Sequence, residues 1–351
     1  MEGTDCVYRD GERCLLHATP TTCPNCVDLL TLSDPAFPSK WSDPLEVIDR
    51  KRRITPAIKD MLAGRPSFLL CGGPSVNDLP LELLNTRGVF VLAVNNAGAH
   101  ARIRPQAFVC SDPPKKFSHS IWMDSGVMKI IPSPKLTNSR RGRLRAKRDG
   151  KFYDLVQTTY ACPNVWGFKR WSWMYPDHRF FATDGACWGN QDKGTKATGQ
   201  EKTVCTMLLG LRLLYYLGSR RIYLLGVDFQ MREGYGYSFG QERSAGAIAS
   251  NNEHFRIVNR WLSEMQNNGT FAKFGLEVFN CFSRSGLRAF PYVPFVDAVK
   301  DCQGICEDVP DTAQWYEQEI ECKACGRTIT PTPGGDCPEC GLKPTAPPVK
   351  V

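Results

Sequence analysis

The sequence of 351 residues has no long apolar run, since none of its apolar stretches approaches the roughly 18 residues that a membrane-spanning helix requires. Its opening stretch, MEGTDCVYRDGERC, is polar and does not resemble a signal peptide. These two absences predict a protein without a membrane partner that works in the cytoplasm, which would be the host cytoplasm if a virus encodes it.

Two common nucleotide-binding motifs are also missing. The stretch LLCGGPSVNDLP (residues 69–80) places a Gly-Gly-Pro-Ser turn after an apolar run, but no Gly-Lys-Ser/Thr follows, so it is not a Walker A loop. It is not G-x-G-x-x-G either, which excludes the usual dinucleotide fingerprint. Taken alone, the stretch is typical of a plain turn between a strand and a short helix.

The composition is ordinary for a globular protein, with 42% apolar and 23% charged residues and a net charge of +8. A basic balance favours an anionic partner, although a moderate charge also aids solubility. Much of the excess is local, because RRGRLRAKRDGK (residues 140–151) contains seven Lys or Arg and one acid.

Cysteine is abundant, and ten of the sixteen cysteines lie in the first 26 and last 50 residues. The C-terminal stretch CKACGRTITPTPGGDCPECG holds two C-x-x-C pairs, and two such pairs supply the four thiolates of a closed, structural zinc site. The expected ligands are Cys322, Cys325, Cys337 and Cys340.

The N-terminal cysteines offer a second metal site whose ligands are ambiguous. CPNC supplies one half-site, and the other half is Cys6 with Cys14, or Cys14 with His17. The five candidates for four places are Cys6, Cys14, His17, Cys23 and Cys26. Zinc on four thiolates is the preferred interpretation, with an iron–sulfur cluster as the alternative. Cys302 and Cys306 belong to a further site or to none.

Short apolar segments alternate with helical ones from residue 67 onward. Continuously apolar strands that alternate with helices predict an α/β protein with a Rossmann-like, mostly parallel sheet flanked by helices. Expected strands are residues 67–73, 89–96, 106–112, 127–134, 221–229 and 275–281, and expected helices are residues 45–64, 201–220 and 251–269.

This pattern divides the chain into four parts. Residues 1–30 form a Cys-rich zinc module, and residues 31–65 form a connecting arm. Residues 66–300 form the core, in which a loop- and Trp-rich segment of about 135–195 is inserted as a lid. Residues 301–345 form a zinc ribbon.

Several short motifs follow one another along the core: CGGPSVNDLP, VLAVNNAG, FVCSD and, much later, TGQEKTVC and GVDFQMREGYGYSF. This ordered set resembles the bacterial sialyltransferases, whose nucleotide loop reads G-N-G-P-S, and the related 6-hydroxymethylpterin pyrophosphokinase-like proteins. The resemblance covers residues 67–296, about two thirds of the chain. It implies a fold that binds a nucleotide-sugar and needs no catalytic metal.

The resemblance also implies which residues bind the donor nucleotide. One family position differs, because Gly73 stands where the family has Asn and one side-chain contact to the nucleotide is therefore missing. Thr198 and Gly199 are expected to open the long helix, whose free N–H groups suit a phosphate. The implied donor site consists of Gly72, Gly73, Pro74, Ser75, Asn95, Asn96, Ser111, Asp112, Thr198, Gly199 and Tyr235.

Three residues are the candidates for catalysis. Tyr237 matches a family tyrosine that donates its hydroxyl to the donor phosphate, and Asp228 lies at the end of the preceding strand. His254 matches the family's general base loosely, and a His can take a proton from an acceptor hydroxyl near neutral pH. The alternatives are that Asp228 braces its loop and that Tyr235 and His254 are ordinary surface residues.

The basic segment predicts the acceptor. Cationic side chains bind phosphates and nearby aromatic side chains can stack on bases, so the pair favours DNA that carries a hydroxymethylated base. The expected DNA-binding residues are Arg140, Arg141, Arg143, Arg145, Lys147 and Arg148, and Trp166, Trp171, Trp173 and Trp188 follow with Phe168, Tyr175, Phe180 and Phe181. The alternatives are a solvated loop over a core of aromatic residues, and a carbohydrate acceptor.

The sequence therefore favours a metal-independent glycosyltransferase with one or two structural zinc ions, a nucleotide-sugar co-substrate and DNA as acceptor. The lack of a D-x-D motif agrees with metal-free transfer. Two alternatives stay open: a pyrophosphokinase-like enzyme that uses ATP and Mg²⁺ with Asp112 and Asp228, or a zinc-bearing nucleic-acid-binding protein with a degenerate core.

Overall fold

A computed structural model describes the core of the chain and several short segments outside it. The described residues are 9–10, 13–14, 47–48, 60–132, 142–148, 151–159, 162–168, 181, 205–239, 244–303, 320–321, 326 and 328–329. Within these ranges, no helix has both the length and the apolar character that a membrane span would need.

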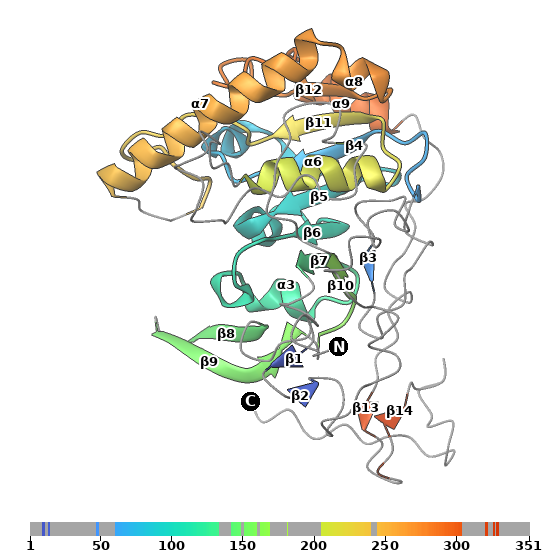
Figure 1. Cartoon of the computed structure of the whole chain (residues 1–351), viewed down its shortest axis with the longest axis vertical. Helices are drawn as coiled ribbons and strands as arrows, with labels where there is room; N and C mark the ends of the chain where they lie inside the picture. The colour runs from blue at the N-terminus through green and yellow to red at the C-terminus, as the bar shows by residue number, and fades with distance from the viewer. Residues whose placement is uncertain are drawn as a thin grey trace, which may run out of the picture.

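An eight-stranded sheet organises the core, with strand order β12-β11-β4-β5-β6-β7-β10-β3 (Figure 1). Its parallel strands are β4 (Ser67–Leu70), β5 (Phe90–Val94), β6 (Ala107–Val109), β7 (Met128–Pro132), β10 (Val165–Phe168), β11 (Arg221–Leu225) and β12 (Glu277–Asn280). The short β3 (Val47–Ile48) pairs antiparallel with β10. The prediction of a mostly parallel α/β sheet is confirmed.

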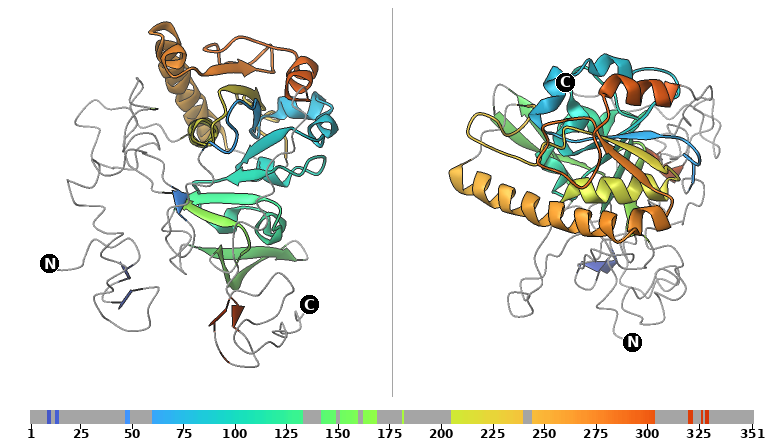
Figure 2. Two further views of the ribbon diagram at one scale, coloured as in Figure 1. Left: turned by 90° about the vertical axis from the view of Figure 1, so that its right-hand side faces the viewer. Right: turned by 90° about the horizontal axis from the view of Figure 1, so that it is seen from above.

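Both faces of the sheet are covered, which explains why its strands are apolar without interruption. On one face, Leu69 and Leu92 pack with α6 (Thr206–Tyr216) and α7 (Ala245–Asn267). On the other face, Phe68 and Val91 pack with α9 (Phe295–Gln303) and the 3-10 helix η3 (Leu81–Leu84). Figure 2 shows α6 and α7 on one side of the sheet and α9 on the opposite side.

The strands are joined by short helices. These are η2 (Pro74–Asp78), η4 (Asn95–Ala99), η5 (Pro114–Lys116) and α3 (His119–Met123), with α8 (Thr270–Lys273) between α7 and β12. Small two-stranded sheets are formed by β1 (Arg9–Asp10) with β2 (Arg13–Cys14), by β8 (Arg143–Arg148) with β9 (Lys151–Thr158), and by β13 (Ile320–Glu321) with β14 (Thr328–Ile329).

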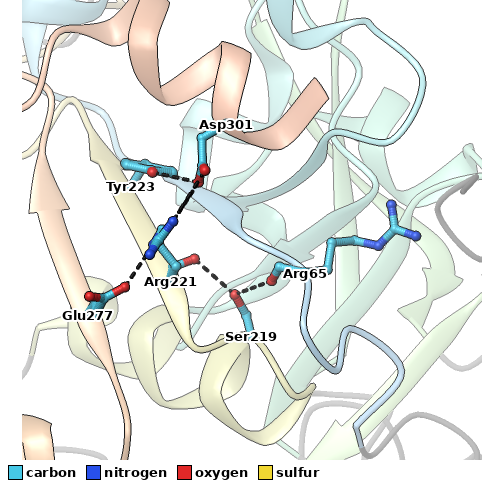
Figure 3. A network of polar contacts seen from close by, with 6 residues as sticks. All are labelled: Arg65, Ser219, Arg221, Tyr223, Glu277 and Asp301. Carbon is cyan, nitrogen blue, oxygen red and sulfur yellow. Dashed lines mark hydrogen bonds and ion pairs between the residues drawn. The ribbon is translucent and has the colours of Figure 1, made fainter. Parts of the chain in front are cut away.

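Polar contacts fasten α9 to the amino ends of β11 and β12 (Figure 3). Arg221 binds the carboxylates of Glu277 at 2.8 Å and Asp301 at 3.2 Å. The Tyr223 hydroxyl donates to Asp301 Oδ2 at 2.7 Å, and the Ser219 hydroxyl donates to the backbone oxygens of Arg65 and Arg221 (Figure 3). Ion pairs and hydrogen bonds therefore hold α9 against the amino ends of β11 and β12, which we call the amino edge of the sheet.

Two local predictions are wrong. The helix expected over residues 45–64 does not form at either described end, because Val47–Ile48 is strand β3 and Asp60 to Gly64 form a turn with a left-handed φ of 72° at Gly64. The loop- and Trp-rich segment of about 135–195, expected to be inserted as a lid, contains β8, β9 and β10, and β10 belongs to the central sheet.

Candidate active site

The polar motifs of the sequence meet at the carboxyl edge of the parallel sheet. From β4 the chain continues through β5, β6 and β7 on one side, whereas β11 and β12 lie on the other side. The order of the strands therefore reverses between β4 and β11, and ligands of open α/β sheets bind outside the carboxyl ends of the strands at such a point.

The glycine loop (residues 72–75) follows β4 and lies directly against the segment after β11. The Gly73 N–H donates to the Gly226 carbonyl at 2.8 Å. A Cβ atom at Gly73 would lie 2.5 Å from both Asp228 Oδ1 and the Gly226 oxygen. Glycine is therefore required at residue 73 by packing inside the protein, where the resembling family has Asn.

Ser75 and Asp228 join the two loops through their side chains. The Ser75 N–H donates to Asp228 Oδ2 at 3.0 Å, and the Ser75 hydroxyl donates to Asp228 Oδ1. The Tyr235 hydroxyl donates to Oδ2 of the same carboxylate at 3.4 Å. Burial raises the pKa of Asp228 above its ordinary value, while the hydrogen bonds from Ser75 and Tyr235 act in the opposite direction.

The tyrosine strap (residues 231–239) carries Tyr235 and Tyr237 and crosses the glycine loop. The Ser238 N–H donates to the Gly72 carbonyl at 2.9 Å. Tyr237 and Phe239 are stacked with ring centroids 5.1 Å apart, and a Cβ atom at Gly72 would lie 2.9 Å from the Phe239 ring. Gly72 is therefore needed because these aromatic rings approach its backbone closely.

Helix α7 holds the beginning of this strap. The Met231 N–H donates to Asn252 Oδ1 at 2.8 Å, and Asn252 Nδ2 donates to the Met231 carbonyl at 2.9 Å. Phe255 stacks on Phe229 with a centroid separation of 4.8 Å. His254 is half-buried on the same stretch of α7, and none of the described contacts joins it to Asp228.

A second polar cluster lies at the carboxyl ends of β5 and β6. Asn95 Nδ2 donates to Thr206 Oγ1 at 3.5 Å, and the Ser111 and Thr206 hydroxyl oxygens are 3.3 Å apart. Asn95 has a left-handed φ of 56°, and within the described part of the chain its buried Oδ1 atom has no hydrogen-bond partner. An unsatisfied acceptor and a strained backbone are features expected of binding sites.

Thr206 is a site residue that the sequence analysis missed. It is the first residue of α6, and the preceding Cys205 has extended backbone angles, so Thr198 and Gly199 do not open this helix. Those two residues lie outside the described ranges. Cys71 was missed as well, but burial raises the pKa of its thiol well above the ordinary value and keeps it protonated.

The other residues predicted to bind the donor contribute less to the two polar clusters around Asp228 and Thr206. Pro74 is buried as the first residue of η2, and Asn96 is half-buried in η4. Asp112 is exposed and forms an ion pair with Lys116 at 3.0 Å.

The predicted DNA-binding residues are only partly described. Arg143 is exposed on β8, where the neighbouring Leu144 is buried in a cluster with Trp122. Arg145, Lys147 and Arg148 lie on the same strand, whereas Arg140 and Arg141 lie outside the described residues. Strand β8 contacts η5, which follows Asp112.

The aromatic part of the predicted acceptor surface is wrong where it is described. Trp166, Phe168 and Phe181 are buried in the main core, so they cannot stack on the bases of an acceptor. Trp171, Trp173, Trp188, Tyr175 and Phe180 lie outside the described residues.

The predicted zinc ligands also lie outside the described residues, apart from the backbone of Cys14 in β2. The described part of the chain contains no group of three or more His, Cys, Asp or Glu side chains that could hold a metal ion. Cys302, for which the sequence left a metal role open, is a residue of α9 and is fully buried in the core.

No model of a protein family matches the chain, and no curated protein matches it. Among solved structures, two structures of the sialyltransferase CstII from Campylobacter jejuni are similar to it, both with 11% sequence identity. The complex with cytidine-5'-monophosphate has a TM-score of 0.36 and covers 66% of this chain and 85% of that chain. The complex with CMP-3FNeuAc has a TM-score of 0.33 and covers 65% and 86%. At these scores the likeness assigns no activity to this chain.

Proposed function

We propose that the protein is a glycosyltransferase that moves a sugar from a nucleotide-sugar donor to a hydroxyl group. Its donor site would lie at the carboxyl edge of the sheet, where strands β11, β4, β5 and β6 end. The observation that carries the proposal is the convergence of the motif residues at this edge. Ser75, Asp228 and Tyr235 meet across the point where the strand order reverses. Asn95 and Ser111 meet at Thr206 beside them.

The proposed chemistry needs two kinds of groups. As the bond between sugar and nucleotide breaks, negative charge develops on the departing phosphate, and hydroxyl donors such as Tyr237 would stabilise it. His254 would accept the proton of the acceptor hydroxyl. The absence of a D-x-D motif in the sequence supports the proposal that no catalytic metal is required.

For the acceptor, we propose DNA that carries a hydroxymethylated base. The support is a basic surface beside the edge: Arg143 is exposed on β8, and the exposed Lys115 and Lys116 lie on η5, which β8 contacts. Incubation of hydroxymethylated and plain DNA with a panel of nucleotide-sugars, followed by digestion and mass spectrometry of the nucleosides, tests this. No added sugar on any base contradicts the DNA proposal and leaves transfer to other hydroxyls intact.

The donor proposal is tested by thermal unfolding with CMP, UDP, GDP and ATP, each with and without Mg²⁺. A nucleotide that raises the melting temperature without Mg²⁺ is the expected result, because ligands that bind the folded state stabilise it. A shift with ATP that depends on Mg²⁺ would favour a pyrophosphokinase-like enzyme instead. No shift with any nucleotide contradicts both, and DNA binding in that case would favour a nucleic-acid-binding protein.

The terminal cysteines are proposed to hold one or two structural zinc ions. Elemental analysis of the purified protein should then find one or two zinc ions per chain, and replacing Cys322 and Cys325 with Ser should remove one of them. A metal-free protein, or one that contains iron, contradicts the proposal.

A further inference from the structure

The glycine loop has little left to offer a phosphate group, although its sequence suggests a phosphate cradle. A phosphate is held by N–H and O–H donors. The Gly73 N–H is occupied by the Gly226 carbonyl, and Pro74 has no N–H. Both the N–H and the hydroxyl of Ser75 are directed to Asp228. Of the loop's backbone N–H groups, that of Gly72 has no partner among the described residues.

Asp228 thus occupies the position that a bound anion would take. Its carboxylate accepts two hydrogen bonds from Ser75 and one from Tyr235, and its exposed fraction is 3%. No lysine or arginine among the described residues forms an ion pair with it. A phosphate placed on this loop would therefore face, at short range, a negative charge that no described lysine or arginine pairs with.

Of the three described hydrogen bonds to the Asp228 carboxylate, the bond from Tyr235 is the longest. The Tyr235 hydroxyl lies 3.4 Å from Oδ2, a longer contact than the 3.0 Å bond from the Ser75 N–H. Tyr235 is half-buried, and its ring lies under the Arg232 guanidinium at 4.9 Å. A ligand hydroxyl can donate to Oδ2 in place of the Tyr235 hydroxyl, whereas an ionised phosphate has no proton to donate.

We infer that Asp228 and the glycine loop receive the 2′- and 3′-hydroxyls of the nucleotide's ribose and exclude its phosphate. The inference rests on the proposed nucleotide-sugar function and specifies how the donor is oriented. The phosphate then lies toward Asn95, Ser111 and Thr206, which carry neutral polar groups. The Asn95 Oδ1 atom has no hydrogen-bond partner among the described residues. Asp228 is accordingly a specificity residue for the ribose.

The exclusion of phosphate is tested with inorganic pyrophosphate as the probe. Asp228→Asn removes the negative charge and nearly preserves the shape of the side chain. We expect the variant to bind pyrophosphate about tenfold more tightly than the wild type, which corresponds to about 1.4 kcal/mol. Glu233→Gln is the control, because it removes an exposed carboxylate from the tyrosine strap while preserving its shape, and it should change the affinity less than twofold. Equal affinities for the wild type and Asp228→Asn overturn the inference.

A second variant tests whether the hydrogen-bond donors of Ser75 and Tyr235 form an anion site when Asp228 is removed. Asp228→Ala leaves the Ser75 and Tyr235 donors without an acceptor, and formate is small enough to replace the lost carboxylate. We expect formate to raise the melting temperature of this variant and not that of the wild type, with sodium chloride as the ionic control. If Asp228→Ala does not fold, the pyrophosphate comparison with Asp228→Asn decides.

Binding of the ribose hydroxyls by Asp228 is tested with CMP, UDP and GDP and their 2′,3′-dideoxy forms. Whichever ribonucleotide binds the wild type should lose about tenfold in affinity when both hydroxyls are removed, because a charged acceptor then loses its partner. Equal affinities overturn the inference and leave the proposed function in place. If none of the nucleotides binds, the proposed function fails, and the pyrophosphate comparison still decides whether Asp228 excludes phosphate.

Discussion

The two edges of the sheet treat their charged side chains differently. At the amino edge, Arg221 is paired with Glu277 and Asp301, and Tyr223 donates to Asp301 (Figure 3). At the carboxyl edge, Asp228 is more deeply buried, yet its described partners are neutral hydroxyl and N–H groups. Burying a carboxylate without a cation costs stability, which its raised pKa reflects.

The difference indicates that the amino edge stabilises the fold, and it agrees with our proposal that the carboxyl edge binds the ligand. Ion pairs at the amino edge fasten α9 to β11 and β12 and leave their charges compensated. Among the described residues, the carboxyl edge has a carboxylate with no cationic partner and a buried Asn95 oxygen with no hydrogen-bond partner. Violations of local rules are expected at functional sites, where the rest of the fold offsets their cost.

The largest effect should come from the turn that carries Asp228. Gly226 has a φ of 62°, and a Cβ atom there would collide with the Cys71 carbonyl oxygen. Gly226→Ala should therefore lower the free energy of unfolding by about 3 kcal/mol, measured by urea denaturation. Gly234→Ala is the control, because Gly234 has a φ of 69° with no atom within 4 Å of its Cβ position. It should lose about 1 kcal/mol, and equal losses would show that the Cys71 contact is unimportant.

Asn252 should matter for the tyrosine strap more than for the fold. Asn252→Ala removes both hydrogen bonds to Met231 and should cost about 1–2 kcal/mol. Hydrogen exchange in residues 232–239 should become faster. Asn259→Ala is matched to it, since Asn259 on the same helix accepts from the Arg288 N–H at 2.7 Å, away from the strap. Faster exchange of the strap in both variants would show that α7 as a whole, and not Asn252, holds it.

Asp301→Asn tests whether a change at the amino edge leaves ligand binding at the carboxyl edge unaffected. Asp301 is about a third exposed, so loss of its ion pair with Arg221 should cost only about 1 kcal/mol. Nucleotide binding should be unchanged, because the carboxyl edge is untouched, whereas Asp228→Asn should change binding strongly. Isothermal titration with the nucleotide that stabilises the wild type compares them. A binding defect of Asp301→Asn as large as that of Asp228→Asn would contradict the division between the edges.

The smallest effect is on pH dependence. The pKa of Asp228 in the folded state is raised above the ordinary value of 3.8. Between pH 3.8 and the raised pKa, the folded state therefore binds more protons than the unfolded state. Its contribution to stability is greatest below pH 3.8 and falls as the pH rises through the raised pKa. The free energy of unfolding of the wild type, relative to Asp228→Asn, should decline over that window. Parallel pH profiles for the two proteins would contradict a raised pKa.

Much of the sheet could be predicted from the sequence because a parallel sheet covered on both faces needs unbroken apolar strands. FLL, FVLAV and IYLL are such runs, and they lie in β4, β5 and β11. Strand β10, with the sequence VWGF, was not predicted because it lies in a segment rich in loops. Helix α9 at the end of the core was not predicted either. The start of α7 was placed six residues too late, although Ser244 caps it by accepting from the Ala247 N–H.

The site was predicted in its parts but not in its contacts. The resemblance selected Ser75 and Asp228, but nothing local indicates that residues 153 positions apart are hydrogen-bonded. Thr206 gave no signal because its partners, Asn95 and Ser111, are 111 and 95 residues away. Gly73 was interpreted as a lost ligand contact, whereas its packing requirement comes from Asp228. Such pairings are set by the tertiary fold and not by sequence pattern.

The central claim is that the carboxyl edge is the ligand site, and hydrogen exchange with and without a nucleotide tests it most directly. With the nucleotide that most stabilises the protein, we expect slower exchange in residues 72–76, 95–99 and 228–237. Exchange in residues 219–223, 276–278 and 298–303 at the amino edge should stay unchanged. Protection at the amino edge with none at the carboxyl edge would contradict the account.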